Sequence, residues 1–270
     1  MSNLRITIVQ STLCWEDAAA NRAMFAQKLQ HISDTDVIIL PETFTTGFSM
    51  KPQSLAEQTQ GNTVYWMKQL AAEKNAVVTG SIIVEEGNKY YNRLLWVQPD
   101  GEVLKYDKRH LFSLTGEDKV MSPGNSKLVA QLTDWKIRPL ICYDLRFPVW
   151  SRNRLMQNGE AEYDALFYVA NWPERRSHAW KQLLVARAIE NQCYVVGINR
   201  VGNDGNDIYH CGDSLVIDPL GQVLFHANDE EVVHTIEINR YNLLSVRQQF
   251  SFLADADDFE LGAKHKFKSH

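Results

Sequence analysis

The sequence lacks the usual features of secreted, membrane-spanning and nucleic-acid-binding proteins. Its four cysteines have no paired spacing, which argues against a disulfide framework and against a zinc site. No apolar run approaches the ~18 residues that a membrane-spanning helix needs, and the amino terminus has no signal-peptide pattern. The net charge of -5 leaves no basic stripe for nucleic acid. We therefore expect a cytoplasmic protein with no membrane or nucleic-acid partner and no metal.

Short apolar segments alternate with amphipathic ones along the 270 residues. Strand-like patterns are found at residues 4–10, 36–40, 76–84, 90–97, 164–170 and 193–198. Helical spacing of apolar residues predicts helices from Asp17 to Ile32, from Gly61 to Lys74 and from about Glu174 to Asn191. No change of composition marks a boundary, so we predict one α/β domain over residues 1–270. Its core covers about 4–238, and 239–270 form a carboxyl-terminal extension.

Two Pro-x-Gly turns, Pro99-Asp100-Gly101 and Pro219-Leu220-Gly221, each separate two strand-like segments. They predict two sheets that each carry an antiparallel hairpin at the edge. The stretch from Ser113 to Asn125 lacks periodicity and is predicted to be a loop. The polar, basic end at 264–270 is predicted to fray.

Cys142 is expected at a turn between a strand and a helix. The apolar segment 137–141 runs directly into it, and Pro148 suits the first turn of a helix. Backbone N–H groups after such a turn are free to face a ligand. Burial as a small apolar residue is equally compatible with this stretch, because free cysteine is often buried. The other cysteines, Cys14, Cys193 and Cys211, are predicted to be buried fillers.

Three strand ends each present a reactive side chain: Glu42, Lys108 and Cys142. Ligand sites in α/β sheets lie at the carboxyl ends of strands, so this shared placement favours a common site. A cysteine is a strong nucleophile once a base takes its proton, and a carboxylate can do so. A lysine ammonium could hold the oxyanion of a tetrahedral intermediate beside the backbone N–H of Tyr143. Taken singly, each residue is more often structural than catalytic.

The segments 41–44, 106–112 and 141–148 contain these residues in the order Glu, Lys, Cys, with further support from 168–173 and 186–191. Together they resemble the nitrilase (carbon–nitrogen hydrolase) superfamily over nearly the whole chain. The resemblance implies Glu42 as general base, Cys142 as nucleophile, Lys108 as oxyanion stabiliser and Glu117 as an orienting residue. It also implies a four-layer α-β-β-α sandwich, a homodimer or higher homo-oligomer, and no cofactor.

Within this superfamily the detail is similar to bacterial omega-amidases. That similarity implies hydrolysis of the terminal amide of 2-oxoglutaramate or 2-oxosuccinamate, and a role in clearing 2-oxoglutaramate in methionine salvage. Such a substrate has a carboxylate at its far end, which needs a cationic or N–H-rich pocket. Arg175 and Arg176 are candidates for it by position, and Trp172 for a wall of the pocket. All three are also compatible with solvated or packing roles.

Several alternatives stay open at this point. Asp144 and Arg146 are expected to lock the turn after Cys142 by ion pairing. A Cys–His pair with His110 or His178 is a rival route to an activated thiol. Another carbon–nitrogen hydrolase (an aliphatic amidase, nitrilase or N-carbamoyl hydrolase) would differ in the stretch from Ser113 to Asn125. A catalytically silent scaffold of the same fold is a further alternative, but it would need none of the three reactive residues.

Overall fold

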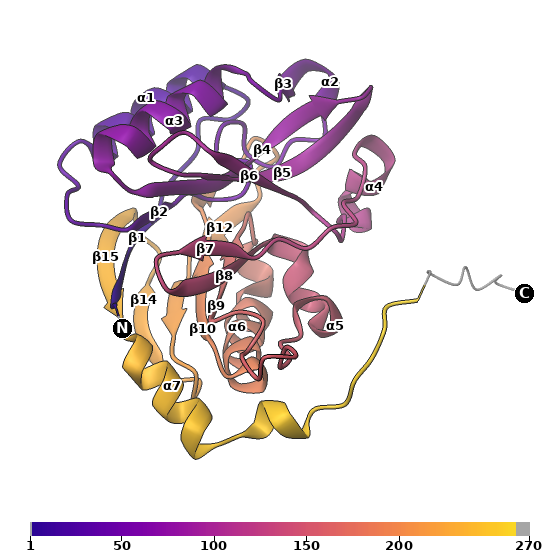
Figure 1. Cartoon of the computed structure of the whole chain (residues 1–270). Helices are drawn as coiled ribbons and strands as arrows, with labels where there is room; N and C mark the ends of the chain where they lie inside the picture. Colours follow the sequence, from indigo (N-terminus) through magenta and orange to yellow (C-terminus); the bar gives the residue numbers. More distant parts are fainter. Residues whose placement is uncertain (1, 263–270) are drawn as a thin grey trace, which may run out of the picture.

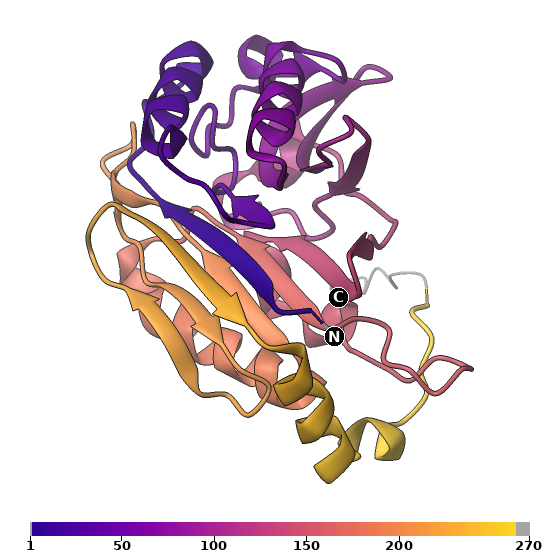
Figure 2. The ribbon, with the colours of Figure 1, turned by 60° about the vertical axis from the view of Figure 1, so that its left-hand side comes forward.

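The computed structural model describes residues 2–262, and its strands form two large mixed sheets that pack face to face (Figures 1 and 2). The first sheet has the order β15 (Val232–Ile238), β1 (Leu4–Gln10), β2 (Val37–Ile39), β4 (Val77–Glu86), β5 (Lys89–Val97) and β6 (Val103–Asp107), with β3 (Glu57–Gln58) pairing β4. The second has the order β14 (Val223–Ala227), β13 (Ser214–Ile217), β10 (Tyr194–Ile198), β9 (Ala165–Val169), β8 (Trp135–Ile141) and β7 (Ala130–Leu132). A separate hairpin pairs β11 (Val201–Asn203) with β12 (Tyr209–Cys211).

Helices cover the outer faces of both sheets. The helices α1 (Ala18–Leu29) and α3 (Asn62–Lys74) lie side by side on the first sheet, and α6 (Ser177–Asn191) lies on the second (Figures 1 and 2). Alternation along β2 explains the layering, because Ile38 joins the cluster under α1 and α3, while Ile39 joins the core between the sheets. In that core, the rings of Trp96 and Phe167 meet across the sheets at 6.2 Å. The predicted four-layer α-β-β-α sandwich is confirmed.

The remaining helical segments are short, apart from one at the carboxyl-terminal end. They are α2 (Pro52–Leu55), α4 (Glu117–Val120), α5 (Pro148–Ser151), α7 (Arg240–Gln249) and the 3-10 turns η1 (Ser113–Thr115), η2 (Cys142–Arg146), η3 (Glu174–Arg176) and η4 (Phe252–Asp255). None of the helices within residues 2–262 is long and apolar enough to cross a membrane.

Both predicted edge hairpins are present. The turn Pro99-Asp100-Gly101 joins β5 to β6, and Pro219-Leu220-Gly221 joins β13 to β14; β6 and β14 are edge strands. Gly101 has a φ of +89° and Gly221 a φ of +86°. This left-handed region favours glycine, which explains why the two turns share their sequence signature.

Some sequence-based predictions were wrong in detail. The stretch from Ser113 to Asn125 is not simply a loop, because it contains η1 and α4, which are too short to show helical periodicity. Helix α1 starts as predicted, with the Asp17 side chain accepting from the Ala20 N–H, but it ends at Leu29. The helix predicted from Glu174 begins with the separate turn η3. Cys14 is exposed and Cys211 half-buried, whereas Cys193 is buried as predicted. The predicted frayed end, 264–270, lies outside the described residues.

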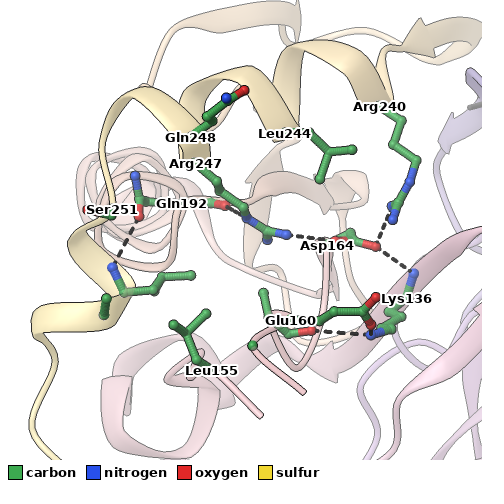
Figure 3. Close-up of a pocket in the computed structure, with 14 residues that line it drawn as sticks. Lys136, Leu155, Glu160, Asp164, Gln192, Arg240, Leu244, Arg247, Gln248 and Ser251 are labelled. Atoms are coloured by element: carbon green, nitrogen blue, oxygen red, sulfur yellow. Dashed lines mark hydrogen bonds and ion pairs between the residues drawn. The ribbon is translucent and has the colours of Figure 1, made fainter. Parts of the chain in front are cut away.

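A buried carboxylate, Asp164, is one of the groups that hold the helix α7 to the second sheet. It accepts hydrogen bonds from the guanidinium of Arg240 at 2.7 Å, from that of Arg247 at 2.8 Å and from the backbone N–H of Lys136 at 3.1 Å. Figure 3 shows both arginines reaching Asp164 from α7, with Lys136 and Glu160 paired alongside. These side chains border a cavity of about 370 Å³.

Candidate active site

Glu42 follows β2 in a tight turn that the first sheet fixes. Thr43 has a φ of +40°, and its N–H donates to Ser81 Oγ at 2.8 Å. Gly80 lies under this turn, where a Cβ would come within 2.9 Å of Leu40 and 3.0 Å of Phe44, so a larger residue would push the turn away. The Glu42 side chain is thereby directed inward and is fully buried.

Lys108 follows β6 and connects two carboxylates. Its Nζ donates to Glu42 Oε1 at 2.8 Å and to both carboxylate oxygens of Glu117 at 3.0 Å. None of the three side chains is exposed to solvent. Burial alone would lower the pKa of Lys108, but the negative charges of Glu117 and Glu42 outweigh it and raise that pKa. The amine therefore stays an ammonium.

Two asparagines that the sequence analysis did not select complete this cluster. Asn92 on β5 donates through Nδ2 to Glu42 Oε1 at 2.8 Å and to Glu117 Oε1 at 3.2 Å. Asn171 donates its backbone N–H to Glu42 Oε2 at 2.8 Å and its Nδ2 to the Glu42 carbonyl oxygen at 2.6 Å. With Lys108, these donors fix both carboxylate oxygens of Glu42.

Cys142 begins the turn η2 and has a φ of +39°, an uncommon value for a residue with a side chain. The carboxylate of Asp144 supports this strained turn. It accepts from the Ile141 N–H at 3.1 Å, from the Tyr106 hydroxyl at 2.7 Å and from the His110 N–H at 3.0 Å. Because Tyr106 lies on the first sheet and Asp144 follows the second, the contact joins the strand that precedes Lys108 to the turn that carries Cys142.

The predicted ion pair between Asp144 and Arg146 is not formed. The ring of His110 takes that place, with Nδ1 2.8 Å from Asp144 Oδ1, and it stacks on Phe147 at 3.9 Å. Arg146 instead points into the cavity at Cys142 and lies 4.8 Å from the ring of Trp172. His110 is thus engaged with Asp144, and His178 is an exposed residue of α6.

Burial raises the pKa of the Cys142 thiol well above its usual range. The negative charge of the nearby Glu42 raises it further, and the positive charge of Lys108 offsets only part of the effect. Cys142 is therefore a thiol at neutral pH, and the adjacent Glu42 carboxylate is positioned to accept its proton.

Arginines and aromatic rings surround the cavity above Cys142. Arg146 and Arg176 line it, as do Trp172 and the more exposed Arg175. The guanidinium of Arg176 lies 5.1 Å from the ring of Phe112. Burial lowers the pKa of Arg176, and the neighbouring positive charges of Arg175 and Arg146 lower it further. Neither Arg146 nor Arg176 forms an ion pair with a described carboxylate, so both are available to an anionic ligand.

The hairpin of β11 and β12 supplies a further wall that the sequence analysis did not identify. Asp204, Ile208 and His210 from this hairpin line the same cavity. Within residues 2–262, no group of three histidine, cysteine, aspartate or glutamate side chains is placed to hold a metal ion.

Comparisons with known proteins agree with this fold. Residues 5–248 match the family model described as carbon-nitrogen hydrolase. The omega-amidase YafV of Escherichia coli K12 is 43% identical over 262 residues, covering 97% of this chain and 100% of that protein. The 2-oxoglutaramate amidase of Bacillus subtilis 168 is 35% identical over 223 residues, covering 82% and 84% of the two chains.

A crystal structure of a CN-hydrolase superfamily protein from Xanthomonas campestris, with an arsenic adduct in its active site, is also similar. It matches with a TM-score of 0.95 at 44% sequence identity, covering 97% of this chain and 100% of that one. The matched family model and these full-length relatives lead to the same conclusion. The chain belongs to the carbon–nitrogen hydrolase family.

Proposed function

We propose that this protein is an omega-amidase that hydrolyses the terminal amide of 2-oxo dicarboxylic acid monoamides such as 2-oxoglutaramate. One observation carries the proposal: a cysteine near a buried carboxylate opens into a cavity lined by Arg146, Arg175 and Arg176, none of which pairs with a described carboxylate. The thiol fits amide hydrolysis, and the arginines fit a substrate with a carboxylate at its other end. The similarity to YafV and to the 2-oxoglutaramate amidase of Bacillus subtilis supports the same substrate class.

In the first half of the proposed reaction, Glu42 removes the thiol proton while Cys142 Sγ attacks the amide carbon. The C=O π electrons move to oxygen, and this oxyanion is held by Lys108 Nζ and by the backbone N–H of Tyr143. Tyr143 lies in the first positions of η2, where N–H groups have no intrahelical acceptor. Glu42 then protonates the amide nitrogen, the C–N bond breaks, and ammonia leaves a thioester on Cys142.

In the second half, Glu42 accepts a proton from water as the water oxygen attacks the thioester carbon. Lys108 and Tyr143 hold the second oxyanion, the C–S bond breaks, and Glu42 returns the proton to the sulfur. Glu117 acts as a positioning residue, because it holds the other side of the Lys108 ammonium and accepts from the Phe112 N–H at 2.6 Å. General acid–base catalysis of this kind contributes about 10²–10⁴ in rate.

The far carboxylate of the substrate would be held by Arg176 and Arg146, with Arg175 nearer to the solvent. Stacking of these guanidiniums on Phe112 and Trp172 limits their freedom and directs their N–H groups. Charge-assisted hydrogen bonds of this type favour a dicarboxylic monoamide over a neutral amide.

The proposal includes a homodimer in the cytoplasm. The four free cysteines suit a reducing compartment. The outer face of α6 and the neighbouring β13–β14 turn expose Ile189 (52%), Leu220 (48%) and Val223 (49%). Gly221 lies directly against Ile189, so these residues share one surface. An apolar surface of this kind is suited to pairing with a second copy.

Ammonia release tests the function directly. Wild type and Cys142→Ala are assayed with 2-oxoglutaramate, glutamine, asparagine and a simple nitrile. We expect turnover of the oxo-amide by wild type only, since the variant has no nucleophile. Activity retained by Cys142→Ala would exclude the thioester route. Wild type that is inactive on 2-oxoglutaramate but hydrolyses another of these compounds would exclude the omega-amidase proposal.

A further inference from the structure

One wall of the cavity at Cys142 has no role in the reaction outlined above. This wall is the β11–β12 hairpin, which places His210 in the same cavity as Cys142, Arg146 and Arg176. The hairpin is fixed at its base, because the Val201 N–H donates to the Ser11 carbonyl oxygen at 3.1 Å. His210 therefore has a defined position relative to the nucleophile.

The imidazole of His210 is buried, uncharged and incompletely hydrogen-bonded. His210 is only 2% exposed, and its Nδ1 has no hydrogen-bond partner among the described residues. Burial lowers the pKa of His210 to about 4, helped by the positive charge of Arg200 and opposed by Asp204 and by the carbonyls of Gly202 and Ile208. The ring is therefore neutral at pH 7.

A neutral imidazole offers one N–H donor and one acceptor, whereas the arginines of this cavity offer donors with a full positive charge. A 2-oxo acid likewise has one neutral and one charged group next to each other, the ketone oxygen and the carboxylate. Guanidiniums prefer the carboxylate, which leaves the ketone oxygen in need of an uncharged donor. Among the cavity-lining residues, His210 is a buried, neutral side chain that can supply one.

We propose that His210 recognises the 2-oxo group of the substrate by hydrogen bonding. The inference rests on the proposed omega-amidase function and names the residue that separates 2-oxo amides from other amides. Glutamine has an ammonium group where the substrate has the ketone oxygen. An ammonium has no acceptor to offer, and the positive charges of Arg146, Arg176 and the buried Arg200 repel it.

The test compares 2-oxoglutaramate with glutaramate, which has a methylene group in place of the ketone. We expect His210→Leu to lower kcat/KM for 2-oxoglutaramate by about tenfold or more, and that for glutaramate by less than about twofold. His210→Gln keeps an N–H donor and should recover part of the loss. His178→Leu, at an exposed position of α6 outside the cavity, is the matched control and should leave kcat/KM unchanged for both substrates.

A binding measurement makes the result independent of the hydrolysis rate. In the Cys142→Ala background, calorimetry compares the binding of 2-oxoglutarate with that of glutarate. His210→Leu should weaken the binding of 2-oxoglutarate only. Equal losses for both compounds, or no loss, would overturn the inference. Wild-type turnover of 2-oxoglutaramate separates the two hypotheses. If it is absent, the proposed function fails and the inference with it; if it is present without selectivity at His210, only the inference fails.

Discussion

Two of the ionic clusters within residues 2–262 have opposite balances of charge. At the candidate active site, two carboxylates, Glu42 and Glu117, share the single ammonium of Lys108, and none of the three side chains is exposed. Under α7, the two guanidiniums of Arg240 and Arg247 share the single carboxylate of Asp164. There the side chains of both arginines are partly exposed, at 17% and 14%.

The two clusters therefore differ in how their excess charge is compensated. Under α7, the extra positive charge is met by solvent, by Asp134 at 3.3 Å from Arg240, and by backbone carbonyls that accept from Arg247. At the candidate active site, the extra negative charge lies beside the Cys142 thiol, whose pKa it raises. The charges of the α7 cluster are compensated by their surroundings, which suits a structural anchor. The buried excess of negative charge beside Cys142 suits the proton acceptor that the proposed reaction needs.

The largest effect should come from removing the cation of the active-site cluster. Lys108→Met removes the proposed oxyanion donor and leaves two buried carboxylates unpaired, so we expect kcat/KM to fall by about 10³ or more. Stability should fall as well, because an uncompensated buried charge is costly. Ammonia release and urea unfolding measure the two effects.

A second variant separates the two consequences of Lys108→Met. Adding Glu117→Gln removes one of the unpaired charges, so stability should partly recover while activity stays absent. Arg240→Met, in the other cluster, is the matched control and should keep activity within about twofold. If Lys108→Met kept its activity within tenfold of wild type, the active-site cluster would matter no more for catalysis than the cluster under α7.

The next-largest effect concerns the proposed role of the cavity arginines in binding the substrate carboxylate. Arg176→Gln should raise KM for 2-oxoglutaramate by about 10-fold to 100-fold with little change in kcat, since a charge-assisted hydrogen bond contributes about 1.5–3 kcal/mol. The neutral amide pentanamide should be unaffected. Arg175→Gln, at the exposed neighbouring position, should have a smaller effect. A parallel loss on both amides would indicate that Arg176 supports the fold of the site and not the carboxylate.

The residues that could be predicted from the sequence are those marked by local signals. Glu42, Lys108 and Cys142 each follow a strand within a recognisable segment, and the edge hairpins are marked by Pro-x-Gly turns. These signals are local because each depends on a few consecutive residues. Helices α1, α3 and α6 were likewise visible as long periodic segments, although their ends shifted by a few residues.

Residues whose role depends on distant contacts could not be predicted in this way. Asn92 looks like an ordinary strand residue until β5 places it between Glu42 and Glu117. Arg146 was expected to pair with Asp144, but the strained turn η2 leaves Asp144 to His110 and directs Arg146 to the cavity. His210 reaches the cavity only because a hairpin far along the chain folds over it. Such contacts are set by tertiary packing and have no sequence pattern of their own.

The smallest effect on activity is expected in the α7 cluster, where the consequence should be confined to stability. Asp164→Asn keeps the shape of the side chain but leaves Arg240 and Arg247 without their shared charge. Because both arginines are partly solvated, we expect a loss of about 2 kcal/mol in the free energy of unfolding, less than for a fully buried pair. Asp134→Asn, which removes an exposed partner of Arg240, should cost about 0.5 kcal/mol or less.

Urea unfolding measures both variants, and kcat should stay within about twofold because the two cavities share no lining residue. A selective fall in kcat for Asp164→Asn at unchanged stability would mean that the two clusters are coupled through the second sheet, and that the cavity under α7 influences the reaction at Cys142.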